Sequence, residues 1–259
     1  MFAIYKRDLM SYFTTPVGYV FMAVFLAING GLFSLMTLQA GQSASVQGYF
    51  SIAILTLVIV IPVLTMKSFS EEKRQRTEQL LLTAPVSIGK IVFGKFLSVY
   101  TIFSGTFIIS TVFNFAVYHK FAENLYILVA DDAKREGALT SWDVLSHFIL
   151  SIAGPAIAAL LLGAAFVAIG VFISAMTENQ IVSFVLSIGV MLVFLLFGAL
   201  NSVIPFEPVR KVLSWLSIYT RFTNFLYGVF DFNAILYYAS ITFIFLFLTV
   251  RIYEKRRWA

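Results

Sequence analysis

The chain of 259 residues has no cysteine, only two histidines, and few charged residues for its length. Without cysteine there is no disulfide framework, no thiolate nucleophile and no Cys-based metal site. Charged residues make up 12% of the chain and hydrophobic residues 60%, whereas a soluble domain carries about 25% charged residues. So few charges could not cover so much apolar mass, which excludes an ordinary water-soluble globular protein.

Long apolar runs account for most of the chain. A spanning helix needs roughly 20 residues to cross about 30 Å of hydrocarbon. Six runs reach this length, and the predicted spans cover about 17–38, 49–66, 91–118, 148–173, 181–200 and 234–250. We therefore expect an all-α integral membrane protein with six transmembrane helices, forming one transmembrane domain over residues 1–259.

Three segments lie outside these spans. Residues 1–15 place Phe2 and Leu9 at helical spacing with charges between them, which predicts an N-terminal helix in the membrane interface, before Thr15 and Pro16 start the first span. The polar segment 119–146 is expected to be a loop. Segment 201–233 is too apolar for a loop and too interrupted for a span, which favours outer re-entrant helices before the last span.

The distribution of Lys and Arg predicts the orientation. Twelve of the eighteen lie near the two ends of the chain or within 67–95, and the other six lie in the segments between the remaining spans. Basic residues are enriched on the cytoplasmic side of membrane proteins, so both termini and segment 67–90 are expected in the cytoplasm. Because these charges adjoin apolar runs, they indicate contact with membrane lipid rather than with nucleic acid.

Segment 67–90 has the most specific pattern. Glu71 and Gln75, like Arg74 and Glu78, are four residues apart and would share a helix face. A leucine run follows, and Pro85 would end the helix. A charged helix that ends in leucines at the membrane surface can dock into a groove of a partner. The alternative is a solvated loop whose charges only fix the topology.

The segment EEKRQRTEQLLLTAPVSIGKIVFGK resembles the cytoplasmic signature of type-2 ATP-binding-cassette (ABC-2) permeases. The shared pattern is a run of mixed charge, Thr followed by Glu, leucines, a proline, and Gly-Lys at the start of the next span. The glycine that often precedes the Thr is Arg76 here. The stretches AIYKRDLMSYFTTPVGYVF and TENQIVSF resemble other parts of the same family. Within it, the chain is most similar to the permease subunit associated with gliding motility.

The resemblance implies a permease of an ATP-driven exporter in the bacterial inner membrane, working with a cytoplasmic ATPase dimer and a second permease chain. ATP and Mg²⁺ would bind the ATPase. This chain is expected to hold no cofactor and to have no enzymatic activity of its own, because Gly89-Lys90 and Gly94-Lys95 lack a phosphate-binding loop. Lys90 and Lys95 are expected to extend to the lipid headgroups. An extracytoplasmic partner could take the place of a cargo.

The same resemblance assigns the site residues. Coupling to the ATPase would involve Glu71, Glu72, Arg74, Arg76, Thr77, Glu78, Leu80 and Leu81. A second contact would involve Thr177, Glu178 and Asn179, for which a capped turn is the alternative. An outer gate would consist of Trp215, Tyr219 and Phe222, which could equally be interface aromatics. No metal site is predicted, since His119 and His147 lack further ligands at metal spacing.

Two other functions fit parts of the pattern. A secondary carrier or channel would work without ATP, but such carriers usually need an ionisable group inside the membrane, and no predicted span centre has one. A scaffold that passes ATPase motion to an outer partner would keep segment 67–90 and carry no cargo. An intramembrane enzyme is not expected, because no polar cluster is evident within the spans.

Overall fold

The computed structural model describes residues 1–38, 46–79, 86–133, 141–200, 206–226 and 231–258, and these residues form helices without any strand. The first half contains α1 (Phe2–Thr14), α2 (Pro16–Phe33), the π-helical turn η1 (Ser34–Leu38), α3 (Val46–Thr65), α4 (Ser70–Arg74) and α6 (Ile88–Ala133). The second half contains α7 (Ser141–Met176), α8 (Gln180–Leu200), α9 (Glu207–Leu216), α10 (Ile218–Leu226) and α11 (Phe232–Trp258).

Among the described residues, six stretches are long and apolar enough to cross a membrane. They are Pro16–Thr37, Gln47–Arg74, Ile88–Asn114, Ile152–Met176, Gln180–Gly198 and Phe232–Arg257. Each of these overlaps one of the six predicted spans, so the all-α fold with six spans is confirmed. The chain is a multi-pass membrane protein.

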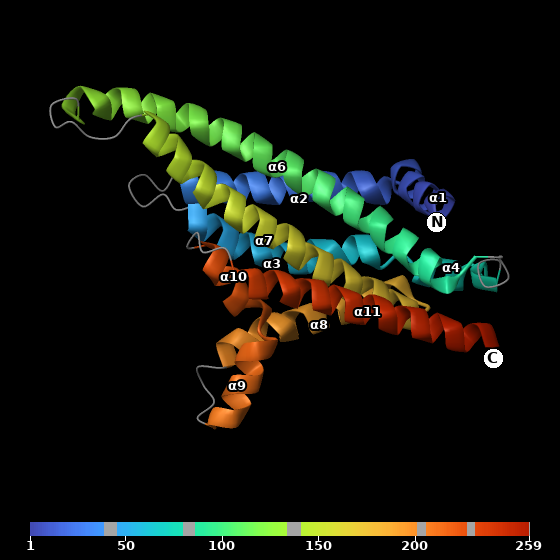
Figure 1. The fold of residues 1–259 in the computed structure, drawn as a ribbon. Coiled ribbons are helices and arrows are strands. Elements are labelled where there is room, and N and C mark those ends of the chain that lie inside the picture. The colour runs from blue at the N-terminus through green and yellow to red at the C-terminus, as the bar shows by residue number, and fades with distance from the viewer. Residues whose placement is uncertain (39–45, 80–85, 134–140, 201–205, 227–230, 259) are drawn as a thin grey trace.

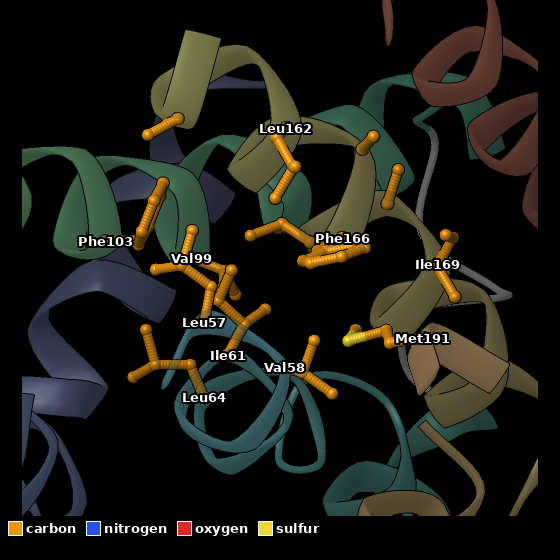
Figure 2. Packing of buried hydrophobic residues seen from close by; sticks show 14 of the residues in the cluster. Leu57, Val58, Ile61, Leu64, Val99, Phe103, Leu162, Phe166, Ile169 and Met191 are labelled. Atoms are coloured by element: carbon orange, nitrogen blue, oxygen red, sulfur yellow. The ribbon is translucent and has the colours of Figure 1, made fainter. Parts of the chain in front are cut away.

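Helix α7 lies at the centre of the bundle and packs against α3, α6, α8, α10 and α11 (Figure 1). The core between α3, α6 and α7 is apolar and includes Leu57, Ile61, Phe103, Leu162 and Phe166 (Figure 2). By contrast, most of α8 and α11 is exposed on the outside of the bundle, and their exposed side chains are largely apolar. An apolar outer surface around a packed core is what a membrane-embedded bundle requires.

Gly170 allows α7 to approach α3 closely. A Cβ atom at this position would lie 2.2 Å from Thr65 Oγ1 and 2.7 Å from Thr65 Cβ. Thr65 is fully buried, so it has no free space into which to move. Only glycine therefore fits where the two helices cross.

Gly170→Ala is expected to lower the free energy of unfolding by about 1–2 kcal/mol, because overpacking outweighs the better helix propensity of alanine. The matched control is Gly189→Ala in α8, where an added Cβ meets nothing within 4 Å. Thermal unfolding of both variants in one detergent, followed by circular dichroism, would measure the difference. Equal melting temperatures for the two variants would contradict the close approach.

The two ends of the bundle differ. Both termini, α1 and α4 lie at one end, and α9 and α10 lie toward the other (Figure 1). The described part of segment 201–233 contains two short helices, α9 and α10, before the last span. The loop prediction for 119–146 is wrong, because α6 continues to Ala133 and α7 begins at Ser141.

A small polar cluster lies inside the bundle, among α2, α3 and α6. Asn114 Nδ2 donates to the Tyr49 hydroxyl at 3.3 Å, and that hydroxyl donates to Asn29 Oδ1 at 3.4 Å. All three side chains are buried. Sequence reasoning missed this cluster because its members come from three different spans. Its groups are uncharged and partner one another, as buried polar groups in a membrane must.

Candidate functional site

The segment that follows the second span is bound to the C-terminal end of α7. After α3 ends, a turn leads into α4, and the backbone N–H groups of Phe69 and Ser70 donate to Ser174 Oγ at 3.0 and 3.1 Å. The Ser174 hydroxyl in turn donates to the Met66 carbonyl at 3.3 Å. Ser174 is fully buried. One hydroxyl therefore satisfies the first amides of α4, which lack partners within so short a helix.

Four charged side chains from α1, α4 and α6 meet beneath this segment. Lys95 Nζ lies 2.9 Å from Glu72 Oε2 and 3.1 Å from Asp8 Oδ2, and it donates to the Ser68 carbonyl at 2.7 Å. Arg7 bridges the same two carboxylates, at 2.8 Å from Glu72 Oε1 and 2.9 Å from Asp8 Oδ1. Two cations and two anions alternate, so the cluster is neutral overall. We call Arg7, Asp8, Glu72 and Lys95 the charge cluster.

The charge cluster corrects the expectation for Lys95. Its side chain is only 3% exposed and points into the protein, and it does not extend to the headgroups. An ammonium can be buried in this way only when anions and hydrogen-bond acceptors surround it. For Arg7, burial by itself lowers the pKa, but the carboxylates of Asp8 and Glu72 outweigh this effect and raise the pKa above its ordinary value.

The end of α11 closes over the other side of α4. Lys73 is buried, and its ammonium donates to the Ala175 carbonyl at the end of α7. The Phe69 and Tyr253 rings pack with their centroids 4.7 Å apart. Arg256 pairs with Glu78 at 3.1 Å. The last turns of the chain thus hold a segment that lies almost 180 residues earlier.

Helix α1 is fixed to the same place by hydrogen bonds. The Tyr12 hydroxyl donates to the Leu64 carbonyl at 2.9 Å, and Lys67 Nζ donates to Thr15 Oγ1 at 3.0 Å. Burial raises the pKa of Tyr12, and the nearby carboxylates of Asp8, Glu71 and Glu72 raise it further. Thr15 does precede Pro16 at the start of α2, as expected. Its hydroxyl, however, donates back to the Ser11 carbonyl and does not cap the helix.

These contacts divide the predicted coupling residues into two groups. Glu72 and Glu78 face inward, in ion pairs with Lys95 and Arg256. Arg74 and Arg76 are exposed, and neither forms an ion pair within the described part of the chain. Glu71 and Gln75 bond to each other at 3.2 Å on one face, as predicted. Thr77 donates to the Glu72 carbonyl at 3.3 Å, and Leu80 and Leu81 lie outside the described residues.

Arg76 occupies an unusual backbone position. Its φ angle is 58°, in the left-handed region that residues other than glycine rarely adopt. It is the position at which the pattern described above often has glycine. The turn thus keeps the backbone conformation that a glycine would suit, and carries a charged side chain there.

The predicted second contact forms a capped turn between α7 and α8. Asn179 Oδ1 accepts a hydrogen bond from the Ile181 backbone N–H at 2.8 Å, and the Thr177 hydroxyl donates to the Ile173 carbonyl at 3.0 Å. Glu178 is exposed. The capping alternative therefore describes the local structure, and it leaves Glu178 accessible from outside.

The three predicted gate residues do not form one surface. Trp215 on α9 is 67% exposed, Tyr219 on α10 is also exposed, and Phe222 is fully buried in the core. Trp215 and Tyr237 meet edge to face at 6.4 Å. Within the described residues, no three His, Asp or Glu side chains come together as a metal site would need. The side chains of His119 and His147 lie outside the described part.

Six spans around a packed apolar core define a multi-pass membrane protein, in which α1 and the end of α11 hold a charged segment at one end of the bundle. A model of the family described as ABC-2 family transporter protein matches residues 31–253. The chain therefore belongs to the ABC-2 transporter family, whose membrane subunits work with a cytoplasmic ABC ATPase. No curated protein matches the chain.

Proposed function

We propose that this chain is the permease subunit of an ATP-driven exporter, and that a separate ATPase acts on residues 70–79. Membership of the ABC-2 family supports a permease. The coupling role is supported by the different surroundings of the two sides of α4 and of the turn after it. One side is held by hydrogen bonds and ion pairs to α1, α6, α7 and α11, and the other side presents Arg74 and Arg76, which form no ion pair with any described residue.

The bound side offers a physical route for motion. A displacement of α4 would pull on α7 through Ser174, on α6 through Lys95 and on α11 through Glu78. These links are hydrogen bonds and ion pairs to buried or half-buried groups, so the segment would move together with the helix ends and not separately from them. Closing of the ATPase would then favour one arrangement of the spans over another.

The proposed orientation follows from charge. The end that carries α1, α4 and the end of α11 is rich in Lys and Arg, which supports a cytoplasmic position in the bacterial inner membrane. A second permease chain would complete a two-fold path. If the chain is the gliding-motility subunit, ATPase work would reach a partner outside the membrane near α9 and α10.

The test changes only the outward side. Arg74→Glu combined with Arg76→Glu is expected to reduce the ATPase that copurifies with the full chain from its own host by about tenfold, since reversed charges repel a complementary surface. The matched control is Lys6→Glu, an exposed Lys at the same end that forms no ion pair within the described residues. ATP hydrolysis in the eluate measures the bound ATPase. Wild-type recovery by the double variant would refute the coupling role.

A further inference from the structure

At the end of the bundle where α9 and α10 lie, an arginine packs against two aromatic rings, which we call the aromatic frame. Arg221, on α10, places its guanidinium carbon 4.5 Å from the Tyr237 ring centroid and 5.9 Å from the Trp215 centroid. These two rings stand nearly perpendicular to each other, so the guanidinium lies in the corner between them. Stacking against ring faces leaves the N–H edges of a guanidinium free for another partner.

This frame is rigidly supported. The Tyr237 hydroxyl donates to the Leu216 carbonyl at 2.6 Å, and the Tyr238 hydroxyl donates to the Ile218 carbonyl at 3.0 Å. Both bonds fix the junction of α9 and α10 to α11. A Cβ added at Gly198 would lie 2.8 Å from Ser217 Oγ, so α8 also packs closely against this junction. These contacts hold the start of α10, the helix that carries Arg221, against α8 and α11.

The charge of Arg221 is not neutralised by an ion pair. Its Nε is buried and has no hydrogen-bond partner, and no carboxylate pairs with it in the described part of the chain. Asp231 is near enough to act electrostatically, but its oxygens already accept from Asn224 Nδ2 at 3.0 Å and from the Asn233 N–H at 2.9 Å. The bond from Asn224 is the main reason that the pKa of Asp231 is lowered, so this carboxyl is ionised and occupied.

We propose that Arg221, framed by Trp215 and Tyr237, binds a phosphate group at this end of the protein. An anion there would neutralise the guanidinium, whose two terminal NH2 groups match two oxygens of one phosphate while the buried Nε stays inside. Trp215 is exposed and Arg221 is half-buried, so part of the corner faces the outside. Exposed tryptophan beside the end of a span is typical of the headgroup level, where phosphates are abundant. The phosphate could belong to a phospholipid or to a soluble phosphate ester.

Native mass spectrometry of the full chain in detergent would test the site. Phosphatidylglycerol is titrated against diacylglycerol, which has the same tails and no phosphate. Arg221→Gln is expected to weaken phosphatidylglycerol binding about tenfold, and Arg221→Lys about threefold, since an ammonium keeps the charge and loses the fork. The control Arg210→Gln removes the same charge from α9, where Arg210 is exposed and 3.8 Å from Glu207, and should change binding less than about twofold.

The outcomes separate the site from other roles of Arg221. Equal losses for Arg221→Gln and Arg210→Gln, or equal binding of the two lipids, would overturn the proposal. A lower melting temperature with unchanged phosphate binding would do the same, because Arg221 would then only hold α10 against α11. Displacement of the lipid by soluble glycerol phosphate would identify a soluble ester as the ligand, and its failure would identify the lipid headgroup. The result does not depend on the coupling proposal.

Discussion

Replacing Lys95 by methionine is expected to lower the free energy of unfolding by about 3 kcal/mol and to weaken the proposed binding of the ATPase. The substitution keeps the length of the side chain and removes its charge. Asp8 and Glu72 would then face each other across a site that is only 13% and 17% exposed, with Arg7 as their remaining cation. Breaking a buried ion pair on one side costs about 3–5 kcal/mol, and the partial exposure of both carboxylates places this case at the lower end.

Two further variants make the result specific. Lys90→Met changes an exposed lysine on the same helix and should be close to neutral. The triple variant Asp8→Asn, Glu72→Gln, Lys95→Met removes the three more buried charges together and leaves only Arg7, whose side chain is 55% exposed to solvent, so it should regain most of the stability. Melting temperature and ATPase copurification measure the two effects separately. If Lys95→Met melts like Lys90→Met, the charge cluster does not hold α1, α4 and α6 together.

Ser174→Ala is expected to free the start of α4 from α7. Two buried backbone N–H groups, those of Phe69 and Ser70, would lose the one acceptor that they have among the described residues. Leaving buried donors unpaired costs about 1–3 kcal/mol, so local opening should become about 30-fold more frequent for a loss near 2 kcal/mol. Hydrogen exchange of the peptide covering residues 66–74 would report this opening directly.

The matched control is Ser240→Ala. Ser240 is exposed on α11, and its hydroxyl donates only to the Leu236 carbonyl of its own helix. Exchange near α4 should therefore stay at the wild-type rate. Unchanged protection of residues 66–74 in Ser174→Ala would show that other contacts, such as that of Lys73 with the end of α7, are sufficient to hold α4.

The six spans could be predicted because hydrophobic length is a local property of the sequence. The contacts around α4 could not, because their partners lie far apart in the chain. Ser174 and Arg256 carry no pattern that links them to residues 70–78. Lys95 was misjudged for a related reason: a lysine near the start of a span fits both a headgroup contact and a buried ion pair. Only the positions of Asp8 and Glu72 decide between them.

The extent of α6 was also misjudged. Residues 119–133 are polar enough to suggest a loop, but they contain neither glycine nor proline, and so nothing ends the helix at the membrane surface. Polarity marks where a span leaves the lipid, and it does not mark where a helix stops. The breaks around α9 were easier to predict, because Pro208 lies at the start of that helix.

The contacts that hold α4 include residues from the last helix of the chain to be synthesised. Tyr253 and Arg256 lie at the end of the last span and are made late, yet they pack against Phe69 and Glu78, which are made early. The surface that we propose binds an ATPase is therefore completed last, when the final helix is in place. A nascent permease with five helices inserted would still lack the contacts of Tyr253 and Arg256. We therefore expect the ATPase to bind only after the last helix is in place.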